Sequence, residues 1–323
     1  MKKKIVEKAI ELRKKGKTWR EIGEILGQSK ENIRFYVRNS EWYKKNVALK
    51  RTSPEDLVLV ISDVHWGRVT YRRDGKLDFC VEKARKRIRR VKDVVLKLRD
   101  ILKRSYDFNG LWLLFLGDII DGELTFPNQQ MHIETPELKQ VLEAVNEFYD
   151  FIVEMRKYFP KVSVRGVYGN HAGDKRKHEI NRGDMYFYKI LEDRFRGEKK
   201  IDVKFSEFFY EIVEINHHKF LLFHGDGIRS YMGIPFYGVK RWGMNRLKTY
   251  GEDWKYLLLG HFHTLGYFNF SGFEVFMNGT LMTNDEHSLR WYGRDGDSRW
   301  WFLSVHKDRG VTFTYKIELK EEE

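Results

Sequence analysis

The sequence predicts an α/β fold preceded by a small helical segment. Five short apolar runs, beginning at residues 57, 111, 162, 220 and 256, have the length and composition of buried strands. In the segments 77–104 and 135–159, apolar residues recur at three- and four-residue steps, which is typical of helices that pack on one face. Residues 1–40 contain helical spacing only, so we expect a separate all-α unit there.

Each of the five apolar runs ends in side chains that bind metals. Four of the endings carry a Gly at the join, which lets the backbone turn tightly enough for several side chains to converge. Open α/β sheets bind ligands outside the carboxyl ends of their strands, so these side chains predict a two-metal site. No Cys is among them, which argues against a structural zinc cage. The endings supply Asp63, His65, Asp118, Asp121, Asn170, His171, His224, His261 and His263.

The five endings also form an ordered set of motifs. They read D-x-H from Asp63, GD-x-x-D from Gly117, GNH from Gly169, then His224 alone, and GH-x-H from Gly260. As a set they resemble the calcineurin-like metallophosphoesterase family over residues 57–280. The resemblance implies a four-layer αββα sandwich, which we place at residues 55–318, and two divalent metal ions.

The resemblance further implies a role for each of these residues. The first metal would be held by Asp63, His65 and His263. The second would be held by Asn170, His224 and His261. Asp118 would bridge the two, while His171 would face the phosphate and protonate the leaving oxygen, oriented by Asp121. We expect Mn²⁺, with Fe²⁺ and Zn²⁺ as alternatives, because ligand sets of oxygen and nitrogen admit several metals.

Two positions depart from the family pattern. Many relatives carry an acid after GNH, where this chain has Ala172. Relatives that dephosphorylate proteins usually have Arg after the second Asp of GD-x-x-D, where Gly122 and Glu123 stand here. The second departure argues against a protein phosphatase and leaves the metal ligands untouched.

The positive charge of the chain is concentrated at its N-terminus. The net charge is +13, and residues 1–52 hold 16 Lys and Arg against 6 Asp and Glu. A concentrated basic segment is the electrostatic footprint of nucleic-acid binding. A single Cys, no apolar run of membrane-spanning length and no signal-peptide core predict a cytoplasmic protein that binds no membrane.

Residues 1–40 resemble a helix-turn-helix. Thr18 with Glu21 forms a capping-box pattern before a second helix, Gly27 fits the turn, and Ser29 caps a third helix. We expect Ile22, Ile25, Leu26, Ile33 and Val37 to face inward. Nucleic-acid contacts on the outer face would come from Lys30, Asn32, Arg34, Tyr36 and Arg38. Residues 41–54 are a predicted linker. The alternative is a helical appendage that docks on a protein partner or on the catalytic domain.

Three further segments support specific expectations. A helix over 77–104 places Cys80 on its apolar face, so we interpret Cys80 as a buried structural thiol. Residues 228–254 interleave basic and aromatic side chains, a pattern that suits a phosphate backbone and stacked bases but also fits ordinary core packing. Residues 319–323 form a charged tail to which we assign no function.

Together these observations predict a two-metal phosphodiesterase that cleaves DNA and is targeted by its helix-turn-helix, as in SbcD-type nucleases. One alternative is a phosphodiesterase or phosphatase acting on a small nucleotide. Another is a DNA-binding regulator with an idle phosphoesterase scaffold, although such a scaffold need not keep a full ligand set. A protein partner or a homo-oligomer is also compatible with the sequence.

Overall fold

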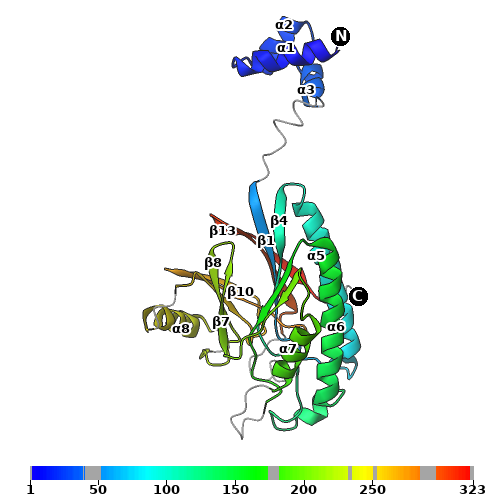
Figure 1. Cartoon of the computed structure of the whole chain (residues 1–323), viewed down its shortest axis with the longest axis vertical. Coiled ribbons are helices and arrows are strands. Elements are labelled where there is room, and N and C mark those ends of the chain that lie inside the picture. The colour runs from blue at the N-terminus through cyan, green and yellow to red at the C-terminus, as the bar shows by residue number, and fades with distance from the viewer. Residues whose placement is uncertain are drawn as a thin grey trace. The chain divides into compact units, whose positions relative to one another are not determined.

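The computed structural model describes residues 2–38, 40, 52–173, 182–231, 235–249, 253–283 and 296–320. The chain divides into two compact units (Figure 1), Met1–Thr52 with Ser105–Asp107, and Ser53–Arg104 with Phe108–Glu323. Most of the predicted linker, residues 41–51, lies outside the described part. Within the described ranges, no helix combines the length and apolar character needed to cross a membrane.

Within its described residues, the first unit contains three helices, α1 (Lys2–Lys14), α2 (Trp19–Leu26) and α3 (Lys30–Arg38). The predicted capping box is confirmed, because the Glu21 N–H donates to Thr18 Oγ1 and the Thr18 N–H donates to Glu21 Oε2. Gly27 ends α2 with φ of 59°, the left-handed turn that glycine favours. The Ser29 cap is also present, since Ser29 Oγ accepts from the Asn32 N–H at 3.2 Å.

A small apolar core holds the three helices together. Its buried members are Ala9, Ile10, Ile22, Ile33 and Val37. Ile25, which we expected to face inward, is 53% exposed, so that expectation was wrong. Leu26, which was also expected to face inward, packs against the core, because it lies four residues after Ile22 on the same face of α2.

The second unit contains two large sheets. One has six strands in the order β13-β12-β1-β4-β5-β6 and the other has five in the order β10-β11-β9-β8-β7. The first comprises β1 (Thr52–Ile61), β4 (Tyr106–Phe115), β5 (Val162–Gly166), β6 (Ile201–Val203), β12 (Arg299–His306) and β13 (Gly310–Glu318). The second comprises β7 (Tyr210–Ile215), β8 (His218–Phe223), β9 (Tyr256–Leu259), β10 (Gly266–Phe270) and β11 (Phe273–Met277).

Helices cover the outer faces of the two sheets. In Figure 1, α5 (Val81–Leu102), α6 (Glu137–Tyr158) and α7 (Arg182–Arg194) lie on the side of the six-stranded sheet, and α8 (Phe236–Thr249) lies on the opposite side. Alternate residues of β1 point to different layers, with Leu57 and Leu59 in the core under the helices and Val58 in the core between the sheets. A third core joins the five-stranded sheet to α8. The predicted four-layer αββα fold is therefore confirmed.

Three predicted boundaries differ from the structure. The helix expected from residue 77 begins at Val81, because Leu77–Phe79 pairs as β3 with β2 (Thr70–Tyr71). Cys80 precedes that helix and is buried, as expected of a structural thiol. Strand β1 begins at Thr52, so the last residues of the predicted linker belong to the sheet. Leu319, placed in the charged tail, is fully buried.

The topology brings the five motifs to one edge of the sandwich. Strands β4 and β5 run parallel, and so do β8 and β9. Parallel neighbours end at the same edge of a sheet, so the loops that follow them meet there. The D-x-H motif follows β1, and its loop is hydrogen-bonded to the loop after β4: the Asp63 N–H donates to the Gly117 carbonyl at 3.1 Å.

Candidate metal centre

Five of the predicted ligands adopt a backbone conformation that residues other than glycine rarely occupy. Their φ angles lie between 48° and 65°. Such angles are uncommon in non-glycine residues and cluster where the surrounding structure enforces a functional geometry. The left-handed turns point successive side chains toward one place at the strand ends. The five residues are Asp63, His65, Asp118, His261 and His263.

Glycines allow the second and third motif loops to approach each other. A Cβ atom at Gly169 would lie 2.2 Å from Asp118 Oδ1, and one at Gly117 would lie 2.3 Å from the Gly169 backbone nitrogen. No larger side chain fits at either position without moving the loops. The glycines that the sequence places at the strand ends are therefore required by close backbone packing as well as by turn geometry.

Asp63, His65 and His263 form the first candidate metal group. One ligand atom of each residue lies within 4.8 Å of the others. The two imidazole Nε2 atoms are 3.1 Å apart, and His263 Nε2 lies 3.3 Å from Asp63 Oδ1. Two nitrogens and a carboxylate oxygen at such spacing fit a divalent cation between them. The residues predicted for the first metal are thus brought together.

Asp118, His224 and His261 form the second candidate group, again within 4.8 Å of one another. His224 Nε2 lies 3.0 Å from Asp118 Oδ2 and 3.0 Å from the Asn170 side-chain oxygen. Asp118 also groups with His65 of the first cluster. A carboxylate that reaches both clusters has the position that a bridging ligand requires.

Hydrogen bonds fix the orientation of two of these imidazoles. His224 Nδ1 donates to the Leu116 carbonyl oxygen at 2.7 Å, and His65 Nδ1 lies 2.9 Å from Asp121 Oδ1. Each bond places a proton on Nδ1 and leaves Nε2 as the atom that faces the cluster. This is the usual way in which a histidine ligand is held in the tautomer that binds a metal.

The electrostatics of the second group favour a cation. Burial lowers the pKa of His224, but the Asp118 and Asp63 carboxylates outweigh it and raise that pKa to about 10. Burial and the neighbouring His224 lower the pKa of His261 to about 3. Since a ligating imidazole must be neutral, metal binding at His224 would release a proton. The carboxylates thus stabilise positive charge at this position, whether a proton or a metal carries it.

His171 lies beside the two groups with its side chain 19% exposed. Its Nδ1 is 3.3 Å from Asp121 Oδ1, an ion-pair distance outside hydrogen-bond geometry. Its ring packs against the rings of His65 and Phe126, with centroids 4.6 Å and 4.5 Å away. Burial lowers the pKa of His171, but the Asp118 and Asp121 carboxylates raise it by more, so the net shift of the pKa is upward. A protonated imidazole here can give a proton to a leaving oxygen.

Asp184, on α7, is a positioning residue that the sequence did not reveal. It is fully buried, and its carboxylate accepts four backbone N–H groups from the second and third motif loops. The donors belong to Asp118, Ile119, Ile120 and Gly169, at 2.8 to 3.0 Å. Burial and the Asp118 carboxylate raise the pKa of Asp184 to about 7, against the effect of the backbone donors. One side chain thus clamps two ligand loops together.

Gln129 and Gln140 hold the segment after the second motif in the same manner. Gln129 Nε2 donates to the Asp121 carbonyl oxygen at 2.5 Å, and its Oε1 accepts the Thr125 N–H at 2.8 Å. Gln140 Oε1 accepts the Gly122 N–H at 2.9 Å. Buried amides of this kind satisfy loop backbone groups and make the loop rigid.

Ala172, the first departure from the family pattern, has a packing explanation. It is fully buried with φ of 56°. Its Cα lies 2.3 Å from the place that a Cβ at Gly122 would occupy, and its Cβ lies 2.5 Å from the corresponding place at Gly183. An acidic side chain would have no room between these two glycines. The small side chain at the position after His171 is therefore explained by close packing against the surrounding backbone.

The predicted nucleic-acid residues lie on α3 of the first unit. Lys30, Asn32 and Arg34 are exposed, and Tyr36 is half-buried. The side chain of Arg38 lies outside the described part. Phe35, on the same helix, is 63% exposed, which the sequence pattern does not predict.

Comparison with known proteins identifies the family. A model for calcineurin-like phosphoesterases matches residues 57–275. The chain is similar to an archaeal phosphodiesterase (TM-score 0.40, 13% identity, covering 81% of this chain and 98% of that one). It is also similar to a dimetal phosphatase from Danio rerio (TM-score 0.41, 12% identity, covering 83% of this chain and 100% of that one). A further similar structure is vacuolar protein sorting 29 from Cryptosporidium parvum (TM-score 0.37, 15% identity, covering 82% of this chain and 100% of that one).

A search of curated proteins finds no significant match. The family model alone covers more than half of the chain, and the family uses divalent metals to hydrolyse phosphoric esters. The candidate ligand clusters lie within the matched region. The chain therefore belongs to the calcineurin-like phosphoesterase family.

Proposed function

We propose that this protein is a two-metal phosphodiesterase that cleaves DNA and is directed to it by its N-terminal helical unit. The observation that carries the proposal is the combination, in one chain, of two ligand clusters linked by Asp118 and a basic helical unit. A phosphoesterase of small esters has no need of an attached unit with so large an excess of positive charge. We also propose a cytoplasmic location, which suits a chain whose one Cys is a buried thiol.

The two metals would be held by the residues described above, with Asp118 between them. When bound, such a pair polarises a phosphoryl oxygen, activates a water and stabilises the attacking and leaving oxygens. We propose Mn²⁺, because carboxylate, imidazole and amide ligands without Cys suit it. Fe²⁺ and Zn²⁺ are the alternatives that the same ligand set admits.

The protein's own side chains supply the rest of the reaction. His171 would donate the proton that the leaving 3′ or 5′ oxygen needs, since its raised pKa keeps the imidazole charged. Asp121 would keep that imidazole and the imidazole of His65 in place. Arg68, whose guanidinium lies 3.7 Å from Asp121 Oδ2, adds positive charge next to an anionic substrate.

The N-terminal unit supports DNA as the substrate. In a helix-turn-helix, the second helix of the motif enters the major groove, and basic residues contact phosphates. Here α2, the left-handed Gly27 turn and α3 have the order and length of such a motif. Lys30 and Arg34 would contact phosphates, while Asn32 could reach a base edge.

Charge reversal on α3 tests this targeting role in the full-length protein. Lys30→Glu with Arg34→Glu is compared with Lys4→Glu and Lys8→Glu on α1, which change the charge equally. The proposal predicts that the α3 pair weakens duplex DNA binding and cleavage at least tenfold more than the α1 pair, while hydrolysis of a small diester is the same in both. Equal effects of the two pairs would exclude α3 as a recognition helix.

The same experiment separates the alternatives. A protein that hydrolyses small nucleotides and ignores DNA would favour the small-nucleotide phosphodiesterase or phosphatase, with the first unit docking on a protein partner. Tight DNA binding without turnover under any metal would favour a regulator with an idle scaffold.

A further inference from the structure

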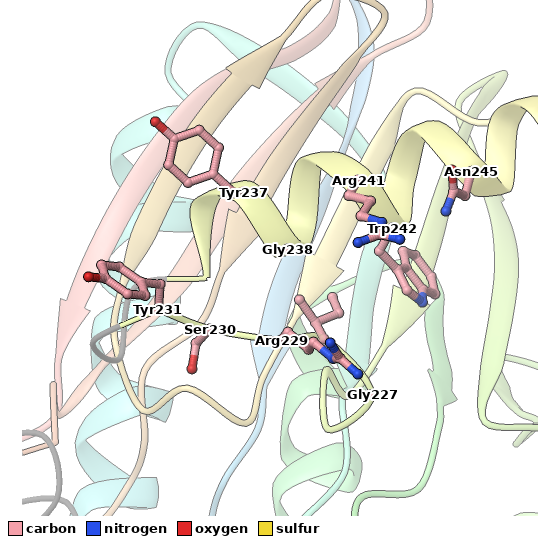
Figure 2. A pocket seen from close by; sticks show the side chains of 10 residues that line it. Gly227, Arg229, Ser230, Tyr231, Tyr237, Gly238, Arg241, Trp242 and Asn245 are labelled. Carbon is pink, nitrogen blue, oxygen red and sulfur yellow. The ribbon is translucent and has the colours of Figure 1, made fainter.

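A pocket of about 510 Å³ lies in the segment between the fourth and fifth motifs. It is lined from one side by the loop that follows His224 and from the other by one face of α8 (Figure 2). Tyr237, Arg241 and Asn245 recur at four-residue spacing along that face. None of the predicted metal ligands lines the pocket, so it is a separate site.

Two arginines give the pocket an unbalanced positive charge. Arg229 comes from the loop and Arg241 from α8, and both are exposed. Within the described residues, neither guanidinium forms a hydrogen bond or an ion pair with a carboxylate. Two guanidinium groups lining one pocket without counter-ions favour an anionic ligand, and their planar donor forks match phosphate oxygens.

Two tyrosines occupy the other end of the pocket. Figure 2 shows Tyr231 and Tyr237 at one end and Arg229, Arg241 and Trp242 at the other. Both tyrosines are 77% exposed, so their ring faces are open to a ligand. Trp242 is stacked on Phe223, with centroids 4.6 Å apart and planes at 9°, and forms part of the wall. A ligand with negative charge and flat rings at separate places along its length would therefore match the pocket.

The pocket is tied to the metal centre through short, tightly packed links. Its first lining residue, Gly227, follows His224 by three positions, which limits their separation to about 11 Å. A Cβ at Gly225 would lie 3.2 Å from Phe262, the residue between His261 and His263. A Cβ at Gly238 would lie 1.9 Å from the Arg229 carbonyl oxygen, so α8 is pressed against the loop. The pocket therefore begins close to the loops that carry the predicted metal ligands.

We propose that this pocket binds an unpaired stretch of the DNA strand next to the phosphodiester that is cleaved. Arg229 and Arg241 hold backbone phosphates, and Tyr231 and Tyr237 stack on bases. Unpaired bases fit because stacking on an aromatic ring requires a free base face, which a duplex does not offer. The inference rests on the proposed function and adds to it that the strand is single where it meets the enzyme.

Binding of a short labelled oligothymidylate, measured by fluorescence anisotropy in EDTA so that no cleavage occurs, tests the pocket directly. Arg229→Glu with Arg241→Glu is expected to raise Kd at least tenfold and to reduce the salt dependence, by about 0.7 in slope for each phosphate that the variant no longer binds. Tyr231→Ala is expected to raise Kd about fivefold to 100-fold, because a base can no longer stack on the tyrosine ring. Arg241→Lys, which keeps the charge, should retain most of the affinity.

Lys240→Glu is the matched control for the single variant Arg241→Glu, because it makes the same charge change one residue away on α8 and does not line the pocket. Pocket variants that bind no more weakly than Lys240→Glu would overturn the proposal, whether or not the protein cleaves DNA. A mononucleotide that competes as well as the oligothymidylate would overturn it in favour of a small ligand. Loss of binding in the pocket variants of a protein that cleaves no DNA would support the pocket as a site for unpaired DNA and refute the proposed nuclease activity.

Discussion

The carboxylate of Asp121 lies between a candidate metal ligand and the candidate general acid. Its Oδ1 is 2.9 Å from Nδ1 of His65 and 3.3 Å from Nδ1 of His171. Burial raises the pKa of Asp121, but His171, His65 and Arg68 more than offset this and hold it well below its usual range. Asp121 is therefore ionised at neutral pH, and one of its oxygens lies beside both imidazoles.

Replacing Asp121 with Asn should affect metal binding and catalysis together. The substitution keeps the shape and removes the charge, so His65 loses its orienting partner and His171 its nearby anion. We expect metal affinity to fall about 10- to 100-fold, as for other partners of histidine ligands, and kcat to remain low even at saturating metal. Metal titration followed by calorimetry and kinetics would show both effects. Full recovery of kcat at high metal would mean that Asp121 does not act on His171.

Removing the His171 imidazole should slow the departure of a poor leaving group without changing the amount of bound metal. His171→Ala is expected to lower kcat about 10²- to 10⁴-fold on a phosphodiester with a poor leaving group, the usual range for a general acid. A diester that releases a nitrophenolate needs no proton and should lose much less. Metal content should match wild type. His217→Ala, on an exposed hairpin, serves as the control. An equal loss on both substrates would contradict the general-acid role.

Asp184 should be important for stability. In Asp184→Asn, the amide nitrogen faces backbone N–H donors that now lack an acceptor, and an unsatisfied buried group costs about 1 to 3 kcal/mol. With two donors affected, we expect a loss of about 3 kcal/mol in the free energy of unfolding, measured in urea. Asp193→Asn, on the same helix but exposed and paired with Arg196, should change it by less than about 0.5 kcal/mol. Identical urea midpoints for Asp184→Asn and wild type would refute the clamp.

Glu211 should make the stability of the protein depend on pH. Burial raises its pKa to about 7, only partly opposed by Arg165, from the ordinary 4.5. The folded state then binds a proton that the unfolded state has released, so stability is highest below pH 4.5 and falls as pH rises to 7. Glu211→Gln should therefore stabilise the protein by about 1 to 2 kcal/mol more at pH 8 than at pH 5.

Denaturation of Glu211→Gln at the two pH values gives that difference. Glu214→Gln, on the same strand with an exposed side chain, controls for the loss of one negative charge. A gain in Glu211→Gln that is the same at both pH values would show that its burial does not shift the titration.

The metal-binding edge was predictable because its signals are local. Each ligand such as His65 or His224 directly follows an apolar run, and strand ends of parallel sheets must meet. Residues that act across the fold gave no such signal. Asp184 is preceded by residues that no motif marks, and its partners are backbone groups of loops more than ten residues away in sequence. Gln140 was hidden for the same reason, inside a helix that looked purely structural.

Short secondary-structure elements could not be predicted from the sequence pattern either. Leu77 continues the apolar spacing of α5, yet it belongs to β3, because its pairing with β2 outweighs helical propensity over three residues. The pocket beside α8 lies almost entirely in residues 228–254, where the interleaved basic and aromatic side chains fit both core packing and nucleic-acid contact. Only the folded arrangement separates Trp242, stacked on Phe223, from the exposed Tyr231 and Tyr237.

The most direct test of the account is Mn²⁺-dependent digestion of single- and double-stranded DNA by the wild-type protein beside Asp118→Asn and His171→Ala. We predict cleavage by the wild type that is lost in Asp118→Asn along with the metals, and lost in His171→Ala with metals still bound. DNA left intact by a wild-type protein that still hydrolyses a small phosphodiester would contradict the central claim that the substrate is DNA.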